Sequence, residues 1–279
     1  MRTPEQLKGQ IRSFAEKHKL MSQEVLQMYL FERVLDRLAA SEYKDNFILK
    51  GGLLISSMLG INERTTMDMD TTITGITMDE DEIAGIIQNI LSIDVGDGIV
   101  FEYKKLEPIR EADDYNNFRA YFNAIYGKIC NPMKLDITTG DKITPAAIEY
   151  SYRCILDEDS IPVKAYNPET IIAEKFETII RRNIGTTRAR DFYDLLRMFE
   201  LYKERISSEV LKWAVKNTSR KRGSEEELAE WKEICSEMRE DTALQNLWKN
   251  YTQTNEFASM LTFEEVLQGV EAVGNFISV

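Results

Sequence analysis

The chain has 279 residues, of which 43% are hydrophobic, and a formal net charge of −12. This composition predicts a globular protein with a substantial core, sufficient for one large domain or two modest ones. The acidity excludes proteins that coat nucleic acid non-specifically, because such binding needs a basic surface; any contact with nucleic acid must therefore be local.

The sequence predicts neither a secreted nor a membrane protein. No apolar run approaches the ~20 residues that a transmembrane helix needs, and the first residues lead into a charged amphipathic pattern rather than a signal peptide. Three widely spaced cysteines argue for a reducing compartment and against zinc or disulfides. The only histidine, His18, argues against Ser-His-Asp or Cys-His hydrolysis. We therefore expect a cytoplasmic protein.

Hydrophobic periodicity predicts helices first, then a mixed α/β region, then helices again. Two helices are expected over residues 4–41, a strand–glycine–helix–strand unit over 47–75, and a helix over 79–91. Strands are expected at 99–106, 118–126, 133–137 and 163–166, and helices from Pro168 onward. The chain therefore reads as an α+β domain over residues 1–200, which includes the N-terminal helices, and a helical domain over 201–279.

The most informative stretch begins with Lys50, Gly51 and Gly52 and ends with Asp68 and Asp70. The glycines lie between an expected strand and an expected helix, where free backbone N–H groups suit a phosphate. Side chains two apart on a strand share a face, and paired carboxylates are suited to a hard cation such as Mg²⁺. The stretch indicates a metal-dependent nucleotidyltransferase; the alternative is a structural turn followed by a solvated Asp-x-Asp pair.

A third acid, Asp136, lies among apolar residues in the expected strand over 133–137. On a strand next to the Asp pair, it would complete the carboxylate trio with which polymerase-type enzymes bind two ions. Alternatively, Asp136 caps a turn or pairs with Arg119 or Lys134.

Lys175 and Asp191 lie on consecutive expected helices joined by a short connection. Asn167 is a plausible N-cap for the first of these helices. Lys175 is a candidate phosphate contact that Asp191 would hold in place. The alternative is a solvated helix face, with a surface pair between Arg190 and Asp194.

Five motifs occur in a characteristic order. They are Lys-Gly-Gly at 50–52, Arg-x-Thr-x-Asp-x-Asp at 64–70, Lys-x-Asp-Ile at 134–137, Ala-Glu-Lys at 173–175 and Arg-x-Arg-Asp-x-x-Asp-Leu at 188–195. In this order and spacing, the chain resembles the AbiEii/AbiGii toxin family from about Phe47 to Leu196.

The resemblance implies a DNA polymerase β-like nucleotidyltransferase core, a mixed sheet flanked by helices, with a helical C-terminal domain. It implies a toxin of a bacterial toxin–antitoxin pair, often active in abortive infection and phage defence. Some members transfer nucleotides from an NTP to the 3′ acceptor end of tRNA, which blocks aminoacylation and hence translation. The cognate antitoxin acts directly or indirectly, and in some members it phosphorylates a hydroxyl that corresponds to Thr66.

The resemblance also implies roles for individual residues. The catalytic set is Asp68, Asp70, Lys175 and Asp191, and the metal ligands are Asp68, Asp70 and Asp136. The nucleotide-binding set is Lys50, Gly51, Gly52, Arg64, Thr66 and Lys175. One departure is Leu53, where many nucleotidyltransferases carry a serine after glycine; Ser56 and Ser57 are the candidate replacements.

We therefore expect a Mg²⁺- or Mn²⁺-dependent NTP nucleotidyltransferase that acts on tRNA. Two alternatives stay open: modification of a protein hydroxyl or a small molecule, and a non-catalytic module that binds NTP or antitoxin. A basic groove from Arg181, Arg182 and Arg188 towards Asp68 would favour RNA, whereas a closed pocket would favour a small molecule.

Overall fold

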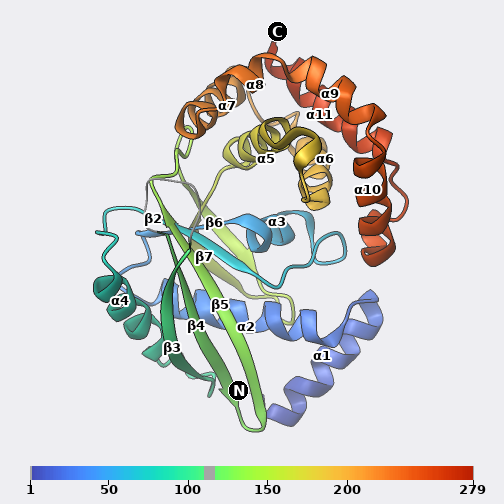
Figure 1. The fold of residues 1–279 in the computed structure, drawn as a ribbon. Helices are drawn as coiled ribbons and strands as arrows, with labels where there is room; N and C mark the ends of the chain where they lie inside the picture. Colours follow the sequence, from blue (N-terminus) through green and yellow to red (C-terminus); the bar gives the residue numbers. More distant parts are fainter. Residues whose placement is uncertain (1, 110–116, 279) are drawn as a thin grey trace. The chain divides into compact units, whose positions relative to one another are not determined.

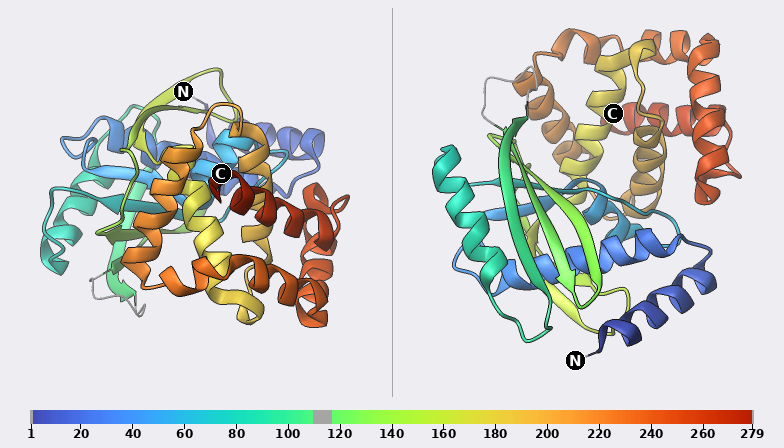
Figure 2. Two further views of the ribbon diagram at one scale, coloured as in Figure 1. Left: turned by 90° about the horizontal axis from the view of Figure 1, so that it is seen from above. Right: turned by 60° about the horizontal axis from the view of Figure 1, so that its bottom comes forward.

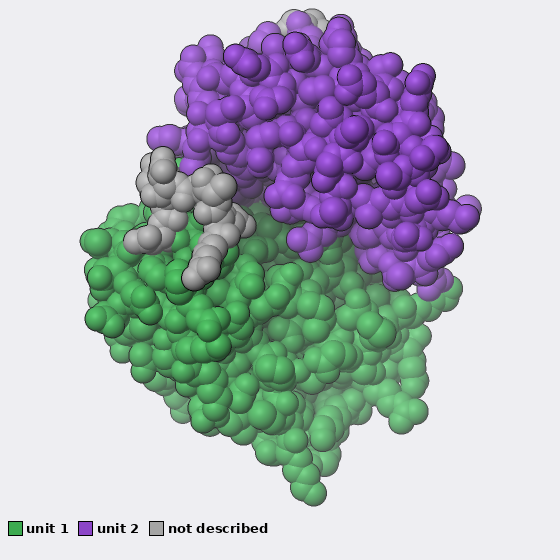
Figure 3. All heavy atoms as spheres, viewed as in Figure 1, with its two compact units in different colours: residues 1–141, 148–165 green, residues 142–147, 166–279 purple. Residues whose placement is uncertain are grey.

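The computed structural model describes residues 2–109 and 117–278 (Figure 1). They form two compact units, residues 1–141 with 148–165 and residues 142–147 with 166–279 (Figure 3). The division expected near residue 200 falls inside helix α6 (Ala189–Tyr202) of the second unit. The division lies earlier because α5 (Pro168–Arg182) packs against α6 and α7 (Ser208–Arg222).

The helices of the first unit begin close to where the sequence predicts. Helix α1 (Pro4–His18) starts with a capping box at Thr3, and α2 (Ser22–Ala39) follows it. Helix α4 (Glu80–Ser92) is capped by the side chain of Asp79, which accepts hydrogen bonds from two backbone N–H groups of the first turn. The predicted helix after the glycines is α3 (Gly51–Leu59).

Seven strands of the described chain form one mixed sheet in the order β3-β4-β5-β2-β1-β7-β6. Their bounds are β1 (Phe47–Lys50), β2 (Met69–Ile73), β3 (Val100–Ile109), β4 (Asn117–Tyr126), β5 (Ile129–Thr139), β6 (Ile148–Arg153) and β7 (Ser160–Ala165). The sequence did not predict β6, an edge strand in which only Tyr152 is buried. Strand β2 pairs parallel with β5 and antiparallel with β1.

One face of the sheet is covered by helices, and the other carries polar side chains. Helices α2 and α4 lie on the covered side (Figures 1 and 2), where Asn131 of β5 donates a hydrogen bond to Gln27 of α2. Buried and partly exposed residues alternate along β4 and β5, so Arg119 and Asp136 point away from this core. The open face of the sheet therefore carries charge next to β2.

The second unit is helical from Pro168 onward, as predicted. After α7 come α8 (Glu225–Ala229), α9 (Trp231–Glu240), α10 (Thr242–Thr254) and α11 (Phe263–Ser278). Asn167 caps α5 as expected, its side chain accepting a hydrogen bond from the Thr170 N–H at 2.7 Å. No helix among the described residues is both long enough and apolar enough to cross a bilayer.

A buried glutamate ties several basic residues of the second unit into its framework. Glu177 is fully buried and accepts hydrogen bonds from Arg181, Arg222 and Ser224. Arg222 therefore serves the packing of α7 against α5 rather than forming a free basic patch.

Candidate active site

The glycine step of the first motif brings helix α3 against two site residues. Gly51 has φ +66, and a Cβ built on it would lie 2.1 Å from Oδ2 of Asp70. A Cβ on Gly52 would lie 2.7 Å from Oγ1 of Thr66. Only glycine permits these approaches, so the motif places the start of α3 directly against the acidic segment.

Asp70 lies where this helix start meets the sheet. Burial raises the pKa of its carboxyl, and the neighbouring Asp136 and Asp68 raise it further. Lys50 and a hydrogen bond from the Gly52 backbone N–H act in the opposite direction. The pKa of Asp70 is therefore raised mainly by burial, and the two neighbouring acids add to that rise.

The sheet register aligns the charged residues in one row. Asp70 is the register partner of Lys50 on β1 and of Asp136 on β5, and Asp136 is the partner of Arg119 on β4. Residues paired across a sheet share a face, so the row reads cation, acid, acid, cation. Asp68 directly precedes β2 and reaches Lys134 of β5. Asp70 and Asp136 therefore lie side by side on neighbouring strands, and Asp68 lies just before β2; a metal site shared by the three stays a prediction.

Two of these acids are occupied by basic side chains. Lys134 Nζ lies 2.7 Å from Asp68 Oδ1, and Arg119 binds both oxygens of Asp136 at 2.6 Å. The pairing of Asp136 with Arg119 that the sequence left open as an alternative is therefore present as well. Among the described residues, no three His, Cys, Asp or Glu side chains lie close enough together to hold a metal ion.

The three aspartates nevertheless offer the type of ligand atom that a hard divalent cation prefers. Asp68, Asp70 and Asp136 offer only carboxylate oxygens, the ligands that Mg²⁺ and Mn²⁺ favour. Before Asp68 and Asp136 can bind a metal ion, their ion pairs with Lys134 and Arg119 must open, because the basic side chains already occupy the carboxylate oxygens.

Thr66 and Arg64 are two further residues of the second motif, and both form hydrogen bonds close to Asp68 in the sequence. Thr66 Oγ1 accepts a hydrogen bond from the Asp68 N–H at 3.2 Å and thereby fixes the local turn. Arg64 is buried and donates to the Thr65 carbonyl. Both residues therefore form hydrogen bonds within the segment that leads to Asp68.

Neither candidate replacement for the missing serine extends the glycine step. Ser56 is buried and donates to the Arg64 carbonyl, while the Ser57 hydroxyl lies 2.9 Å from that of Tyr150. At the helix start, phosphate binding would therefore depend on backbone N–H groups, without a hydroxyl from either serine.

The second unit contains a buried cluster around Lys175. Its Nζ lies 2.6 Å from Asp191 Oδ1 and 2.8 Å from Asp194 Oδ2. The Lys175 side chain is 14% exposed, and those of Asp191 and Asp194 are 1% and 0% exposed. The predicted contact between Lys175 and Asp191 is present, and the solvated-face alternative for Lys175 is wrong.

Asp194 is the member of this cluster that the sequence analysis missed. The alternative that paired Asp194 with Arg190 on the surface is wrong, because Asp194 lies on the buried side of α6, three residues after Asp191. This i, i+3 spacing on one helix face was the available signal.

Mutual attraction keeps the cluster ionised despite its burial. Burial lowers the pKa of Lys175, but Asp191 and Asp194 raise it more, so the net shift is upward. Burial likewise raises the pKa of Asp191, yet Lys175 and Arg188 outweigh it and the net shift is downward. Lys175 thus carries a positive charge throughout the physiological range.

The family model described as nucleotidyl transferase AbiEii toxin, type IV TA system, matches residues 33–269. A solved structure described as a nucleotidyltransferase from H. pylori is similar, with a TM-score of 0.53 and 16% identity over 93% of this chain and 98% of that one. JHP933 from Helicobacter pylori gives a TM-score of 0.52 and 17% identity over 93% and 95% of the two chains. No curated protein matches the sequence.

Proposed function

Because the chain belongs to the AbiEii family of nucleotidyltransferase toxins of type IV toxin–antitoxin systems, we propose that it transfers a nucleotide from an NTP to the 3′-hydroxyl of tRNA. Family membership makes the protein a nucleotidyltransferase with an NTP substrate and an antitoxin partner. The metal ion and the tRNA acceptor are our proposal, as are the residue roles below.

The observation that carries the proposal is the pairing of Asp70 with Asp136 across β2 and β5, with Asp68 beside them. These three acids would hold Mg²⁺ or Mn²⁺. A bound ion of this kind activates the attacking hydroxyl and neutralises the departing pyrophosphate. The helix start at Gly51 and Gly52 would receive phosphate oxygens on backbone N–H groups, close to the same acids.

Lys50, Thr66 and Arg64 would act around this centre in different ways. Lys50 Nζ lies 2.6 Å from Asp141 Oδ2 and also lowers the pKa of Asp70, so it would supply positive charge at the end of the row. Thr66 and Arg64 would position Asp68 through the turn that they stabilise.

Within the second unit, Lys175 would act as a phosphate contact and Asp191 would hold it in place. The two buried carboxylates orient the Lys175 ammonium and keep it charged, which a phosphate contact requires. Asp191 and Asp194 would thus act as positioning residues for Lys175.

A surface of α7 supports a nucleic-acid acceptor. Trp213 is 51% exposed, and the exposed Lys212 and Lys216 lie beside it on the same side of the helix. An exposed indole flanked by lysines suits an unpaired base and its neighbouring phosphates. In an acidic protein, such a local group meets the requirement for contact with RNA.

The test incubates the purified protein with total RNA, Mg²⁺ and each labelled NTP in turn. We expect label in the tRNA band, and none when the RNA has been oxidised with periodate to destroy its 3′-terminal diol. Asp68→Ala should abolish the labelling. Label on protein, or on a small molecule, would replace the tRNA acceptor with one of the two other acceptor classes.

The α7 surface has its own matched control. Trp213→Ala should raise the KM for tRNA at least about fivefold, the cost of losing one stacked base, while KM for NTP stays unchanged. Met260→Ala removes a side chain that is 89% exposed without flanking lysines, and should change neither constant. Equal effects of the two substitutions would remove α7 from the acceptor site.

A further inference from the structure

We propose that Lys134 and Arg119 are exchangeable counter-ions, which bind Asp68 and Asp136 in the metal-free protein and turn to phosphate oxygens of the NTP when a divalent cation binds. The inference rests on the proposed metal-dependent function. It assigns a phosphate-binding role to Lys134, which begins the Lys-x-Asp-Ile motif, and to Arg119, which lies outside the motifs.

The first observation is that the basic side chains already occupy the atoms that a metal would use. Lys134 Nζ contacts Asp68 Oδ1 at 2.7 Å, and Arg119 takes both oxygens of Asp136 at 2.6 Å. A divalent cation therefore competes with the Lys134 ammonium and the Arg119 guanidinium for the same carboxylates. Binding of the metal and release of the two side chains are one exchange.

The second observation is that both pairs are accessible enough to exchange. The side chains of Lys134 and Arg119 are 39% and 33% exposed, and those of Asp68 and Asp136 are 36% and 18% exposed. Water can solvate each partner during the exchange, so opening such pairs costs little stability. The buried Lys175 cluster offers no comparable freedom.

The third observation is the position of the Lys134 and Arg119 side chains once their ion pairs have opened. Both side chains remain on the open face of the sheet, Lys134 on the strand next to that of Asp70 and Arg119 one strand further away. The start of α3 lies against Asp70. Arginine binds phosphate oxygens with a planar fork, and lysine does so as a point charge. A helix start adds further attraction for an anion. In the proposed reaction, the triphosphate of the NTP is the anionic ligand that these positive groups would attract.

The exchange makes metal and NTP binding mutually dependent. Metal alone must displace two cations without a gain elsewhere, and NTP alone meets cations that are already engaged. When both bind, the metal neutralises the acids and frees the two basic side chains, and the NTP gives these side chains a new partner. The two ligands therefore bind with positive coupling. The site thus favours loading with metal and NTP together.

The test compares Lys134→Gln and Arg119→Gln with the unaltered protein in two binding measurements. Mn²⁺ alone, followed by its electron paramagnetic resonance signal, should bind severalfold more tightly to the variants. The affinity for a non-hydrolysable NTP analogue with Mg²⁺, measured by calorimetry, should fall about tenfold, as expected for one lost charge-assisted contact. The two affinities must move in opposite directions.

Lys104 provides a control on the same sheet. Its Nζ lies 2.8 Å from Glu102 Oε2, and the two side chains are 43% and 51% exposed. Lys104→Gln should leave both affinities unchanged. Thermal unfolding of all variants identifies any substitution whose effect comes from loss of folding.

Several outcomes overturn the inference. Metal and nucleotide affinities that fall together, or a metal affinity that does not rise, make the pairs structural. An unchanged NTP affinity with a raised KM for tRNA assigns the cations to acceptor phosphates instead. If the unaltered protein binds no Mn²⁺ even with NTP present, the proposed metal-dependent function fails first, and this result is distinct from the other two.

Discussion

Two groups of ion pairs in this molecule use the same residue types in opposite surroundings. On the open sheet face of the first unit, the pairs of Asp68 and Asp136 are partly exposed, with Lys134 itself 39% exposed. In the second unit, Lys175 is 14% exposed between two aspartates that are 1% and 0% exposed. Burial separates pairs that can exchange partners from pairs that are locked in place.

The difference follows from the cost of taking charge out of water. A buried ion that loses its partner stays in a poorly solvated site, whereas an exposed ion is solvated at once. The sheet face can therefore present its acids to a new cation, and the Lys175 cluster can hold one ammonium in one orientation. Substitutions in the two groups should accordingly separate activity from stability.

The largest expected effect is loss of activity from the sheet face. Asp68→Ala should reduce nucleotide transfer and growth arrest by at least about a thousandfold, the scale for removing a group that stabilises transition-state charge. The free energy of unfolding should hold or rise, because one of several repelling carboxylates is gone. Transfer to tRNA and urea unfolding measure the two quantities; growth arrest by the variant would show that the toxin acts through other chemistry.

Lys175→Met should instead show its effect first as a loss of stability. The substitution leaves Asp191 and Asp194 buried without their lysine, at a cost of roughly 3–5 kcal/mol. Lys134→Met on the sheet face is the matched substitution and should cost only about 0–1 kcal/mol. Chemical denaturation of both variants tests the comparison directly.

A triple variant separates stability from function at the same cluster. Lys175→Met combined with Asp191→Asn and Asp194→Asn also removes the two carboxylate charges that Lys175 balanced, and should recover much of the lost stability without recovering NTP affinity. Recovery of both would move Lys175 out of the phosphate site and leave it a structural residue.

The sequence predicted this molecule best where the signals are local. The glycine step, the Asp-x-Asp spacing and the caps at Asp79 and Asn167 all depend on a few neighbouring residues, and all appear as expected. The basic residues that form ion pairs with the aspartates are set by the sheet register, which pairs strands that are distant in sequence. Arg119 and Lys134 were therefore visible as alternatives for Asp136, but the reach of Lys134 to Asp68 was not.

The misplaced unit boundary and the missed aspartate have a related cause. Asp194 looked like a surface residue because Arg190 lies four positions before it, yet packing of α6 against α5 buries it. The same packing moves α5 and α6 into the second unit, because their apolar faces meet the later helices. Periodicity shows that a face is buried, but it does not show which element buries it.

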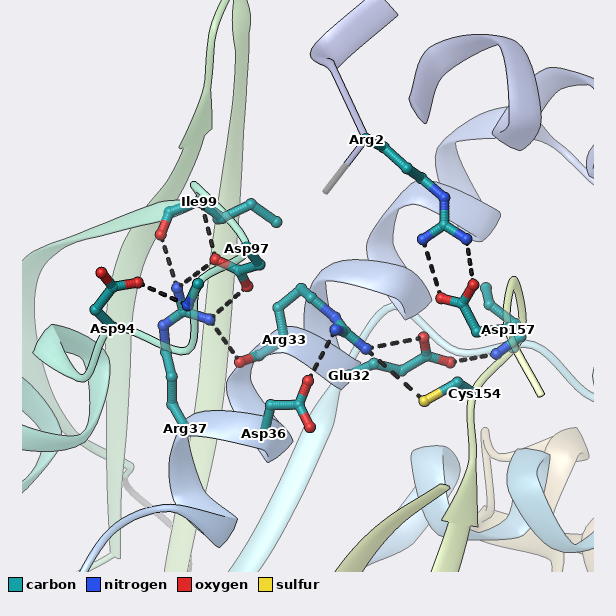
Figure 4. A network of polar contacts seen from close by, with 12 residues as sticks. Arg2, Glu32, Arg33, Asp36, Arg37, Asp94, Asp97, Ile99, Cys154 and Asp157 are labelled. Carbon is teal, nitrogen blue, oxygen red and sulfur yellow. Dashed lines mark hydrogen bonds and ion pairs between the residues drawn. The ribbon is translucent and has the colours of Figure 1, made fainter. Parts of the chain in front are cut away.

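Glu32 extends the comparison between the ion pairs, because it is a buried acid without a close ion pair of its own. It is fully buried on α2 and accepts a hydrogen bond from the Ile155 N–H at 2.7 Å (Figure 4). Its nearest cation, Arg33, lies 3.9 Å away and is bound to Asp36 at 2.8 Å. Burial raises the pKa of Glu32 to about 8. Unlike Asp191, this acid is not held in its ionised form.

The sign of the pH effect follows from that direction. A carboxyl with a raised folded-state pKa favours the folded state while it is protonated, so its contribution is complete below about pH 4.5 and is lost as the pH rises through about 8. Glu32→Gln keeps the acceptor for Ile155 and removes the charge. The variant should be more stable than the unaltered protein at pH 9 by a few kcal/mol, and nearly equal to it at pH 5. Thermal unfolding at both pH values measures this; a gain of equal size at pH 5 would contradict the titration of Glu32.

A pair of glycine substitutions tests the contact between the start of α3 and Asp70. Gly51 and Gly60 both have positive φ, +66 and +98, but a Cβ on Gly60 would meet nothing within 4 Å, whereas one on Gly51 would lie 2.1 Å from Asp70. Gly60→Ala should therefore cost about 1–2 kcal/mol of backbone strain and leave nucleotide transfer intact. Gly51→Ala adds displacement of the Asp70 carboxylate, so transfer should fall far more than the change in stability explains. Equal activities in the two variants would show that the approach of α3 to Asp70 serves the fold alone, and that the acids bind their cation without support from the glycine step.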